Sequence, residues 1–537
     1  MLLNFSYSDF DDLHQGKVRN PAYGTFGERL YYAERINGID STLVNDKPWI
    51  QKQSAYSQYN FLGKILFQPG EHSRYILNVQ YSNSSDIPRY DRLTEMKGAN
   101  MKFAEWYYGP QSRLLASLKA EYNLNGVIFD HASVIIGYQN IHEDRINRKF
   151  LDSLKMYNLE EVGVFSLNAD FDKKLGSKDN LRYGIEMDYN NVNSNAHIEN
   201  INTSVITEDL ATRYPDQKAN MMYLSAYLSN NWTINNVLAF SQGIRFNYVT
   251  LDAAYSDTMV QIMKIPFDPN INQKNAAVNG YLGLLATPGY DWKFSLVGST
   301  GFRAPNIDDL TKLNAVTGNT IVVPNPDLKP EYAYNVELSI GKTIASCVRL
   351  EGTAWYTWLR DAQVIEPIKY NGQDSISIKG EMYQTLAPTN AKKAYIYGLQ
   401  GGLRAQVTRS LSIISNLTYT YGWVETEDVP MDHIPPFFGM TSFRLELKKF
   451  KGDFYVMYNG WKRLSQYSNS GEDNLQYATE YGMPSWYTLN LKLSYQVSKY
   501  LNIELGMENI LDENYRKFAS GISAPGRNII LAVRATL

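Results

Sequence analysis

The sequence predicts an all-β protein, a transmembrane antiparallel up-and-down β-barrel, and alternation of side chains is the first observation that predicts it. Apolar and polar residues alternate from Tyr487 to Val497, and they alternate again from Leu501 to Glu508. Successive side chains on a strand point to opposite faces, so each segment has one apolar face and one hydrated face. Hairpins of such two-faced strands are typical of membrane barrels.

The lengths of the connections are the second observation. Tight turns are expected at residues 68–71, 175–178 and 287–289, whereas the first strand is followed by a long stretch that reaches about Gln53. In a membrane barrel, short periplasmic turns alternate with long external loops. A soluble β-sandwich also has alternating strands, but it has no reason to gather its long loops at one end. The pattern therefore favours the barrel.

Alternating segments continue along the whole chain and predict about 20 strands. In order, they are residues 2–9, 56–67, 74–81, 114–122, 131–139, 164–171, 181–189, 223–232, 237–248, 278–286, 290–302, 332–340, 348–358, 395–407, 411–421, 437–447, 454–458, 487–497, 501–508 and 529–537. No compositional break separates them, so we expect a single unit over residues 1–537. A barrel of this size has an interior too wide for side chains to fill.

Composition and charge exclude several classes of protein. The net charge of -3 comes from 52 basic and 55 acidic residues mixed along the chain, so no basic stripe points to nucleic acid as a partner. No window offers the roughly 18 apolar residues that a spanning helix needs, which excludes a helical membrane protein. The 41 tyrosines against 21 phenylalanines fit strand ends that meet lipid headgroups, because tyrosine has an apolar ring and a polar tip.

The sequence carries no pattern of catalytic residues. No nucleophile elbow, phosphate loop, zinc ligand pair or catalytic dyad appears at usable spacing, so we expect no enzyme, no metal site and no cofactor. An outer-membrane lipase or protease is the alternative, and it would need a serine, a histidine and an acid gathered at the rim. The single cysteine, Cys347, falls in an expected strand and has no partner for a disulfide, so we expect a small buried or lipid-facing residue.

The first seven residues have the pattern of a β-strand. They have neither a positively charged segment nor a long apolar segment, so they do not form a secretory signal. An outer-membrane protein must be exported. From the sequence alone we therefore expect the chain to be the later part of a longer gene product, or the product of a truncated gene.

Several segments resemble the barrel of TonB-dependent outer-membrane receptors, and the likeness covers nearly the whole chain. Residues 301–310, with the letters GFRAPNIDDL, and residues 324–331, with the letters PNPDLKPE, are similar to the paired FRAP and NPDLKPE boxes of that family. Residues 390–399 resemble its entry into a later strand, residues 430–439 resemble its IPP segment, and residues 509–515 with 525–527 resemble its final loop and strand.

The resemblance implies a 22-stranded barrel with an amino-terminal plug domain, gated by an inner-membrane TonB complex that supplies energy for uptake. Against that pattern we expect about 20 of the 22 strands here, and we expect the signal sequence, the TonB box, the plug and the first two strands to be missing. That departure puts energised transport by this polypeptide alone in doubt. Leu537 also stands where the family usually ends on an aromatic residue.

Four charged residues of the paired boxes are candidates for contact with a ligand or with the plug: Arg303, Asp308, Asp309 and Glu331. The interpretation that we favour is structural: these groups pair with one another while the nearby prolines stiffen the chain where it leaves the strands.

Histidines and aromatic clusters give weaker candidates. His142 and His433 fall at expected external loops, where each could touch a ligand or simply be solvated. Residues 106–108 and 355–358 are aromatic clusters, and a belt at the membrane interface is the favoured interpretation over stacking on a substrate.

The function expected from the resemblance is TonB-dependent uptake of a scarce ligand, a chelate of the iron-siderophore, haem or cobalamin type. The expected partners are outer-membrane lipid, the missing plug domain, the TonB complex acting through that plug, and the chelate itself. Two alternatives remain open. One is an ungated, porin-like diffusion channel. The other is a truncated, non-functional barrel whose open strand edges would favour aggregation.

Overall fold

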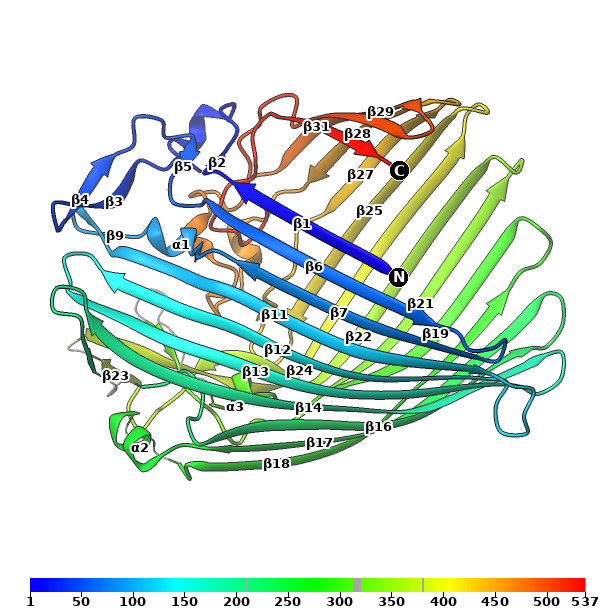
Figure 1. Ribbon diagram of the computed structural model, residues 1–537, viewed down its shortest axis with the longest axis horizontal. Coiled ribbons are helices and arrows are strands. Elements are labelled where there is room, and N and C mark those ends of the chain that lie inside the picture. The colour runs from blue at the N-terminus through cyan, green and yellow to red at the C-terminus, as the bar shows by residue number, and fades with distance from the viewer. Residues whose placement is uncertain (208–210, 264, 266, 312–319, 379–380, 537) are drawn as a thin grey trace.

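A computed structural model describes residues 1–207, 211–263, 265, 267–311, 320–378 and 381–536 of the chain. Most of these residues belong to one large sheet that curves into a barrel wall, and each long strand pairs antiparallel with the next (Figure 1). The predicted all-β fold is confirmed. No helix within the described ranges is long and apolar enough to cross a membrane.

Twenty strands form the continuous ladder in the described residues, so the expectation of about 20 strands is confirmed. In order around the wall they are β1 (Leu2–Phe10), β6 (Tyr56–Phe67), β7 (Ser73–Ser84), β11 (Phe103–Asn123), β12 (His131–Lys149), β13 (Leu154–Lys174), β14 (Asp179–Asn200), β16 (Lys218–Thr233), β17 (Leu238–Ala254), β18 (Asn270–Ala286), β19 (Trp292–Arg303), β21 (Glu331–Ile344), β22 (Val348–Pro367), β24 (Glu381–Gln406), β25 (Leu411–Val424), β27 (Phe438–Glu446), β28 (Phe450–Asn459), β29 (Trp486–Ser498), β30 (Leu501–Glu508) and β31 (Asn528–Ala535).

Short strands and helices lie at one end of this wall. They are β2 (Leu13–His14), η1 (Pro21–Tyr23), β3 (Tyr31–Ile36), β4 (Ile39–Val44), β5 (Ile50–Gln51), β8 (Ile87–Pro88), α1 (Tyr90–Leu93), β9 (Met96–Lys97), β10 (Asn100–Met101), β15 (Val205–Thr207), α2 (Asp257–Met263), α3 (Ile307–Thr311), β20 (Thr320–Val322), β23 (Ser375–Ile378), β26 (Val429–Pro430), η2 (Leu464–Gln466) and η3 (Leu475–Tyr477). The first long loop therefore contains a hairpin, β3 with β4, that the sequence did not predict.

Tight turns lie at the opposite end, as predicted. Residues 68–72 join β6 to β7, residues 175–178 join β13 to β14, and residues 499–500 join β29 to β30. The first residue of β1 and the last residues of β31 also lie at this end, because β31 pairs with β30 beside the turn at residues 499–500. Apart from the turn at residues 150–153, connections at the other end are long, so that end is the external one by the rule for membrane barrels.

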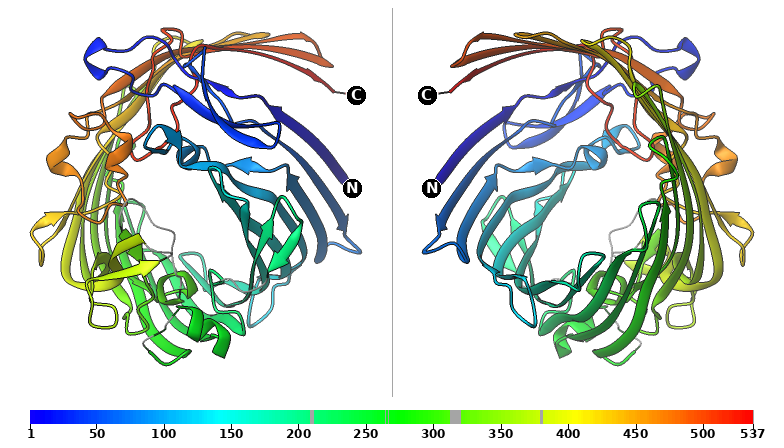
Figure 2. Two further views of the ribbon diagram at one scale, coloured as in Figure 1. Left: turned by 90° about the vertical axis from the view of Figure 1, so that its left-hand side faces the viewer. Right: turned by 90° about the vertical axis from the view of Figure 1, so that its right-hand side faces the viewer.

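The wall has one polar face and one apolar face. Val249 and Leu251 of β17 are buried against Leu310 of α3, a helix that Figure 2 shows inside the ring of strands, so this face of β17 is the inner one. Ile244 and Phe246 point the other way and are 56% and 49% exposed. Exposed apolar residues of the same kind follow the outer face of neighbouring strands, as a lipid-facing surface requires.

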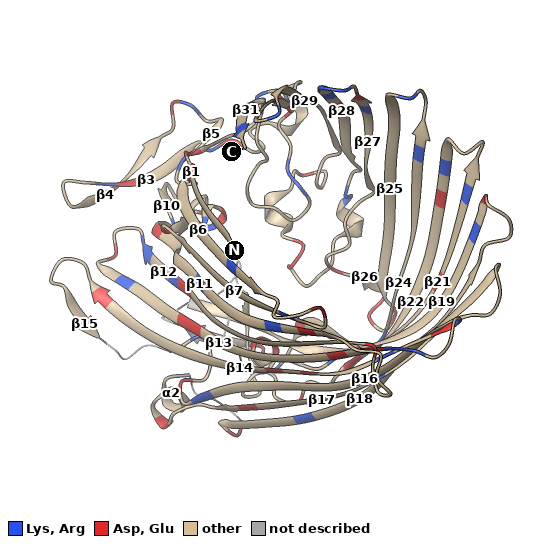
Figure 3. Ribbon diagram, turned by 45° about the vertical axis from the view of Figure 1, so that its right-hand side comes forward, with Lys and Arg blue, Asp and Glu red and all other residues tan. Residues whose placement is uncertain are grey.

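Polar groups pair across the inner face near the tight turns. Arg182 on β14 forms an ion pair with Asp172 on β13 at 2.7 Å, and the next inward residue of β13, Asp170, accepts a hydrogen bond from a tyrosine of β16. Figure 3 shows basic and acidic residues interspersed along the strands, with no long stretch of one sign. The lumen is therefore hydrated and carries mixed charge.

Many strands are much longer than a membrane is thick. A tilted transmembrane strand needs about 9 to 11 residues, whereas β13 has 21 residues, β14 has 22 and β24 has 26. The residues nearest the tight turns cross the bilayer, so the surplus stands on the external side. We call this projecting part of the wall the collar.

Three expectations at single residues are wrong. Cys347 lies in the turn between β21 and β22, where it is exposed, and not within a strand. Trp106 does not belong to an interface belt: it is buried in the collar, and the guanidinium of Arg89 lies 4.7 Å from its ring. His142 lies within β12 and not in a loop, because the collar continues the strand beyond the predicted end at Gln139.

The first and last strands of the ladder are unusually open. Every residue of β31 is exposed, as is nearly every residue of β1, whereas strands in the middle of the ladder have half-buried inner faces. Figure 2 shows these two strands facing each other at one place in the ring. The wall is therefore least covered at this seam between β1 and β31.

Candidate functional site

The two boxes that the sequence singles out come together at the external mouth. Arg303, the last residue of β19, donates two hydrogen bonds to the carboxylate of Asp309, at 3.0 and 2.9 Å. The same guanidinium also donates to the side chain of Gln363 on β22. Gln363 in turn donates its backbone N–H to Glu331 at 2.8 Å. We call this set of four residues the mouth brace.

The helix α3 carries one side of the mouth brace, and its first turn is capped. The Asn306 side chain accepts a hydrogen bond from the N–H of Asp309 at 2.9 Å, and Asp309 accepts one from the N–H of Asn306 at 3.0 Å. Such reciprocal bonds satisfy donors that a helix start leaves free. Ile307 and Leu310 face the opposite way and are buried against the inner face of β16, β17 and β18.

The second box is held to the wall by side-chain amides. Asn390 of β24 donates to the carbonyl of Lys329 at 2.9 Å and accepts from the N–H of the same residue at 2.8 Å. Gln273 of β18 donates to the carbonyls of Pro326 and Leu328, at 2.9 and 3.0 Å. Prolines remove backbone donors from this segment, so its carbonyls take their partners from the strands.

Asp308 faces away from the mouth brace, toward the loop that follows β15. The hydroxyl of Tyr214 donates to its carboxylate at 2.6 Å, and the guanidinium of Arg213 lies 3.6 Å away. Burial, with the neighbouring Asp308 charge as the next cause, raises the pKa of Tyr214 well above its usual range. Tyr214 therefore stays protonated and acts as a donor.

Glu160 of β13 is a buried acid beside this loop. Only 7% of the residue is exposed, and neither carboxylate oxygen has a hydrogen-bond partner. The pKa of Glu160 is raised to about 8, mainly by burial, while Ser194 works in the lowering direction and the charges of Asp144, Glu143 and Asp308 add to the rise. Counted from the tight turn at residues 175–178, Glu160 lies beyond the roughly 9 to 11 residues that cross the bilayer. Near neutral pH the side chain is largely the neutral acid.

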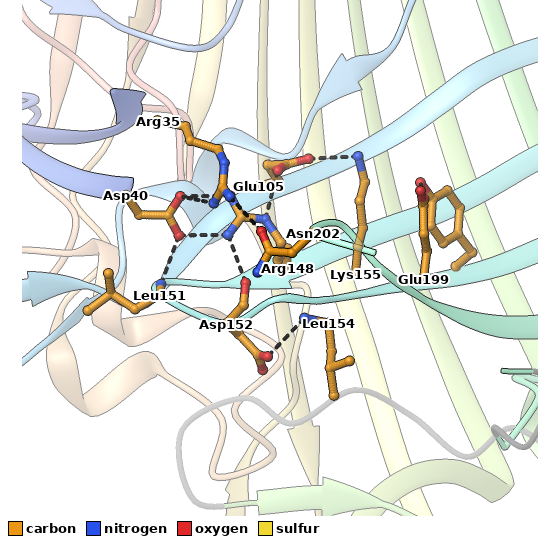
Figure 4. Close-up of polar contacts among 11 residues, drawn as sticks. Arg35, Asp40, Glu105, Arg148, Leu151, Asp152, Leu154, Lys155, Glu199 and Asn202 are labelled. Carbon is orange, nitrogen blue, oxygen red and sulfur yellow. Dashed lines mark hydrogen bonds and ion pairs between the residues drawn. The ribbon is translucent and has the colours of Figure 1, made fainter. Parts of the chain in front are cut away.

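A buried ion pair fixes the β3–β4 hairpin to the collar (Figure 4). Arg148 of β12 and Asp40 of β4 form two hydrogen bonds, at 2.6 and 2.9 Å, and each side chain is 1% exposed. Asp40 also accepts from the N–H of Leu151 at 2.8 Å, and Arg148 donates to Glu105 at 2.8 Å. We call the pair of Arg148 and Asp40 the hairpin clamp.

Charge partners surround the hairpin clamp. Lys155 lies 2.7 Å from the other oxygen of Glu105, and Arg35 of the hairpin donates to Asn202 in the loop after β14 at 3.1 Å. Burial alone raises the pKa of Asp40, but the hydrogen bonds from Arg148 and Leu151 outweigh that effect and hold the pKa below its usual value. The first external loop is thus tied to β12, to the turn that follows β12 and to the loop after β14.

The two candidate histidines lie apart from these groups. The Nε2 atom of His142 lies 3.8 Å from Glu161 of β13, on the outer side of the strand. His433 lies in the loop after β26 with a positive φ of 58°, and its N–H donates to Asp473 at 2.8 Å. In the described part of the chain, no three His, Cys, Asp or Glu residues are arranged to hold a metal ion. Residues 312–319, between the two boxes, lie outside the described residues.

Sequence reasoning missed Glu160 and the hairpin clamp. No motif surrounds Glu160, whose burial results from contacts with residues far along the chain. Asp40 and Arg148 are 108 positions apart, and a single sequence gives no signal that links them. A hairpin within the first long loop was detectable in principle, because residues with strand preference flank Asn37 and Gly38, a common tight-turn pair.

A family comparison decides how this barrel is classified. The model of the family described as "TonB dependent receptor-like, beta-barrel" matches residues 4–510. The chain belongs to this family. The resemblance carried by the paired boxes is thereby confirmed, and so is the location in the outer membrane of a bacterium.

Solved structures of two other proteins share the fold. The copper transporter OprC superposes with a TM-score of 0.76 at 13% identity, over 99% of this chain and 75% of its own. The FrpB iron transporter from Neisseria meningitidis, F3-3 variant, superposes with a TM-score of 0.71 at 12% identity, over 99% of this chain and 76% of its own. At such identities the likeness concerns the fold alone.

A curated sequence relative also matches part of the chain. The iron-regulated outer membrane virulence protein of Vibrio cholerae, strain El Tor Inaba N16961, is 25% identical over 246 residues. The match covers 44% of this chain and 36% of the relative. The TonB-dependent receptor barrel described here thus matches about a third of the length of that protein.

Proposed function

We propose that the chain forms the wall and external mouth of a TonB-dependent receptor that takes up a scarce chelate of the iron-siderophore, haem or cobalamin type. The match of the family model over residues 4–510 is the observation that carries this proposal. The relative from Vibrio cholerae is named as iron-regulated, and the two similar structures are named as transporters of copper and of iron. These names support a metal-containing cargo without choosing among the three types of chelate.

The rigid wall and the external loops have different roles in the proposed capture of a large solute. The lumen is hydrated, and the loops at the external mouth are fixed to rigid strands by the hairpin clamp and the mouth brace. Rigid strands that present variable loops are a common arrangement for binding sites. In the proposal, the loops capture the chelate, a plug domain completes the site from inside the lumen and acts as the gate, and a TonB complex supplies the energy.

We propose that Arg303, Asp309 and Glu331 position the mouth and do not contact the chelate. Their charged groups are engaged with one another or with Gln363. Asp308 is likewise engaged, with Tyr214. The ligand contacts then come from the loops themselves, among which His433 is one candidate.

Uptake by intact cells tests the proposal. A strain that lacks the gene is compared with its parent and with a strain that lacks the TonB protein, using radiolabelled iron supplied as several ferric siderophores and as haem, and labelled cobalamin. We expect one cargo whose uptake is lost in both deletion strains. Returning the intact receptor gene to the strain that lacks it should restore that uptake.

Two other results would contradict the proposal. Unchanged uptake of every cargo in the receptor deletion would exclude the assigned role under these conditions. Uptake that persists without TonB, rises linearly with concentration and extends to unrelated small sugars would instead support the ungated channel.

A further inference from the structure

The outer face of β21, β22, β24 and β25 has a layered surface at its external end. Three cross-strand rows follow one another toward the outside on the same face. Residues in the first row are mainly aliphatic, and they include Leu338, Ala354 and Leu399. Leu338 and Leu399 are 45% and 56% exposed, as expected for side chains that touch lipid tails.

Two aromatic rows come next. The first contains Tyr356, Tyr397 and Tyr421, and the second contains Tyr334, Trp358, Tyr395 and Trp423. The rings form a continuous set: the centroids of Tyr356 and Tyr395 are 5.7 Å apart, and those of Tyr421 and Trp423 are 6.1 Å apart. Aromatic girdles of this kind mark the boundary between lipid tails and headgroups. The belt predicted at residues 355–358 thus lies on this face, through Tyr356 and Trp358.

Cationic residues form the next row out. Arg360 of β22 and Lys393 of β24 are cross-strand partners, two residues beyond Trp358 and Tyr395. Two residues along a strand advance about 6.6 Å. Both cations therefore lie at the level of the headgroups, directly above the aromatic boundary. Both are exposed, and neither takes part in an ion pair among the described residues.

A groove joins the aromatic rows to the cations. It has a volume of about 610 Å³ and is lined by Tyr334, Tyr356, Trp358, Arg360, Lys393 and Tyr395, among others. Glu425 also lines it, so two positive charges face one negative charge. The volume falls within the range of small-molecule sites, about 300 to 1,000 Å³. The groove thus combines an aromatic lining with a positively charged outer end.

We infer that this groove binds a phosphorylated glycolipid of the external leaflet. The acyl chains lie along the aliphatic row, the sugar packs on the aromatic rings, and the phosphate meets Arg360 and Lys393. Charge complementarity at the correct depth favours a lipid over a soluble anion, because a soluble anion has no apolar part to contact the lower half of the groove. Basic residues beside an anionic membrane surface add to the attraction of its lipids.

Lipid binding by the detergent-solubilised receptor tests this inference. The probes are bisphosphorylated lipid A, the same lipid after removal of its phosphates, and inorganic phosphate. Bound lipid is counted by native mass spectrometry over a concentration series. We expect the intact receptor to prefer the phosphorylated form about 10-fold or more, and the double variant Arg360→Gln with Lys393→Gln to lose most of that preference.

A matched control separates a local site from general charge. Lys274 is exposed at the external end of β18, on the outward side of its strand and away from the aromatic rows. Lys274→Gln removes one outer cation and is expected to leave lipid preference unchanged. The heat-dependent shift of the folded barrel on an SDS gel confirms that each variant folds.

Three results would overturn the inference. The first is equal binding of the two lipid forms by the intact receptor. The second is a double variant that keeps the full preference, or a Lys274→Gln variant that loses as much. The third is displacement of the lipid by millimolar inorganic phosphate, because it would show that the cations bind a free anion and not a lipid.

Discussion

At the scale of single residues, the hairpin clamp is the contact whose loss should cost most. Removing one partner of a buried pair leaves the other charge without compensation, which costs about 3 to 5 kcal/mol. Asp40→Ala leaves Arg148 buried with Glu105 as its remaining carboxylate partner, so we expect a cost toward the lower end of that range. We expect the β3–β4 hairpin to detach while the barrel stays folded, and limited proteolysis should then cut near residues 37–38.

The control for this prediction lies on the same hairpin. Glu34 is exposed on β3, and Glu34→Ala should leave the protease pattern unchanged. Hydrogen exchange gives a second measure, since amides of β3 and β4 should lose protection in Asp40→Ala alone. Equal protection in both variants would mean that other contacts hold the hairpin.

Glu160 predicts a dependence of stability on pH. Its pKa is about 8 in the folded chain and near 4.5 when unfolded. As pH rises from about 4.5 to 8, the unfolded chain releases a proton that the folded chain keeps, so the folded state loses stability. Below that range both states are protonated and the effect vanishes. Glu160→Gln should therefore raise the free energy of unfolding at about pH 9, by on the order of 2 to 4 kcal/mol, and leave it unchanged near pH 4.

Circular dichroism of the detergent-solubilised barrel measures this difference. Glu161→Gln is the matched control, because Glu161 is the next residue, is about half exposed and lies on the other face of β13, 3.8 Å from His142. A gain of equal size in Glu161→Gln, or a gain for Glu160→Gln at low pH as well, would contradict the assignment to Glu160.

At the scale of elements, the mouth brace can be distinguished from a ligand site. A double-mutant cycle with Arg303→Ala and Asp309→Ala should give a coupling of about 1 kcal/mol in chemical unfolding, because the ion pair is partly exposed. Asp309→Ala should cost more than Arg303→Ala, since Asp309 also caps the first turn of α3. Ligand affinity should change little.

A second ion pair serves as the comparison for this experiment. Arg349 and Glu351 form an ion pair near the tight turns, where both side chains are about half exposed. A cycle at that pair should give less coupling, because no helix depends on it. Unchanged stability with a large loss of chelate binding in the Arg303 and Asp309 variants would assign them to the ligand site.

Elements also differ in how much of them could be predicted. Inside the bilayer each strand must present lipid to one side and water to the other, so alternation is strong, as in β29 and β30. In the collar both faces meet water or other loops, and alternation fades. The segment predicted at residues 395–407 corresponds to the half of β24 that lies nearest the tight turns. The other half of β24 pairs with β22 and β23 above the membrane.

At the scale of the whole molecule, fold class, strand number and the end that carries the long loops follow from sequence alone. These properties depend on periodicity and on connection length, which are local. The mouth depends on contacts between distant segments, such as Asn390 with Lys329 or Tyr214 with Asp308. The two boxes can be recognised in a single sequence. The hydrogen-bond partners of their charged side chains come from distant segments and were identified only in the structure.

The collar gives the molecule a reach that a bare barrel would lack. About twelve residues of β14 remain beyond the bilayer, which is about 40 Å along the strand and roughly 25 to 30 Å in height once tilt is included. Sheet of that length is stiff, so the entrance stands among the outer sugars of the cell instead of beneath them.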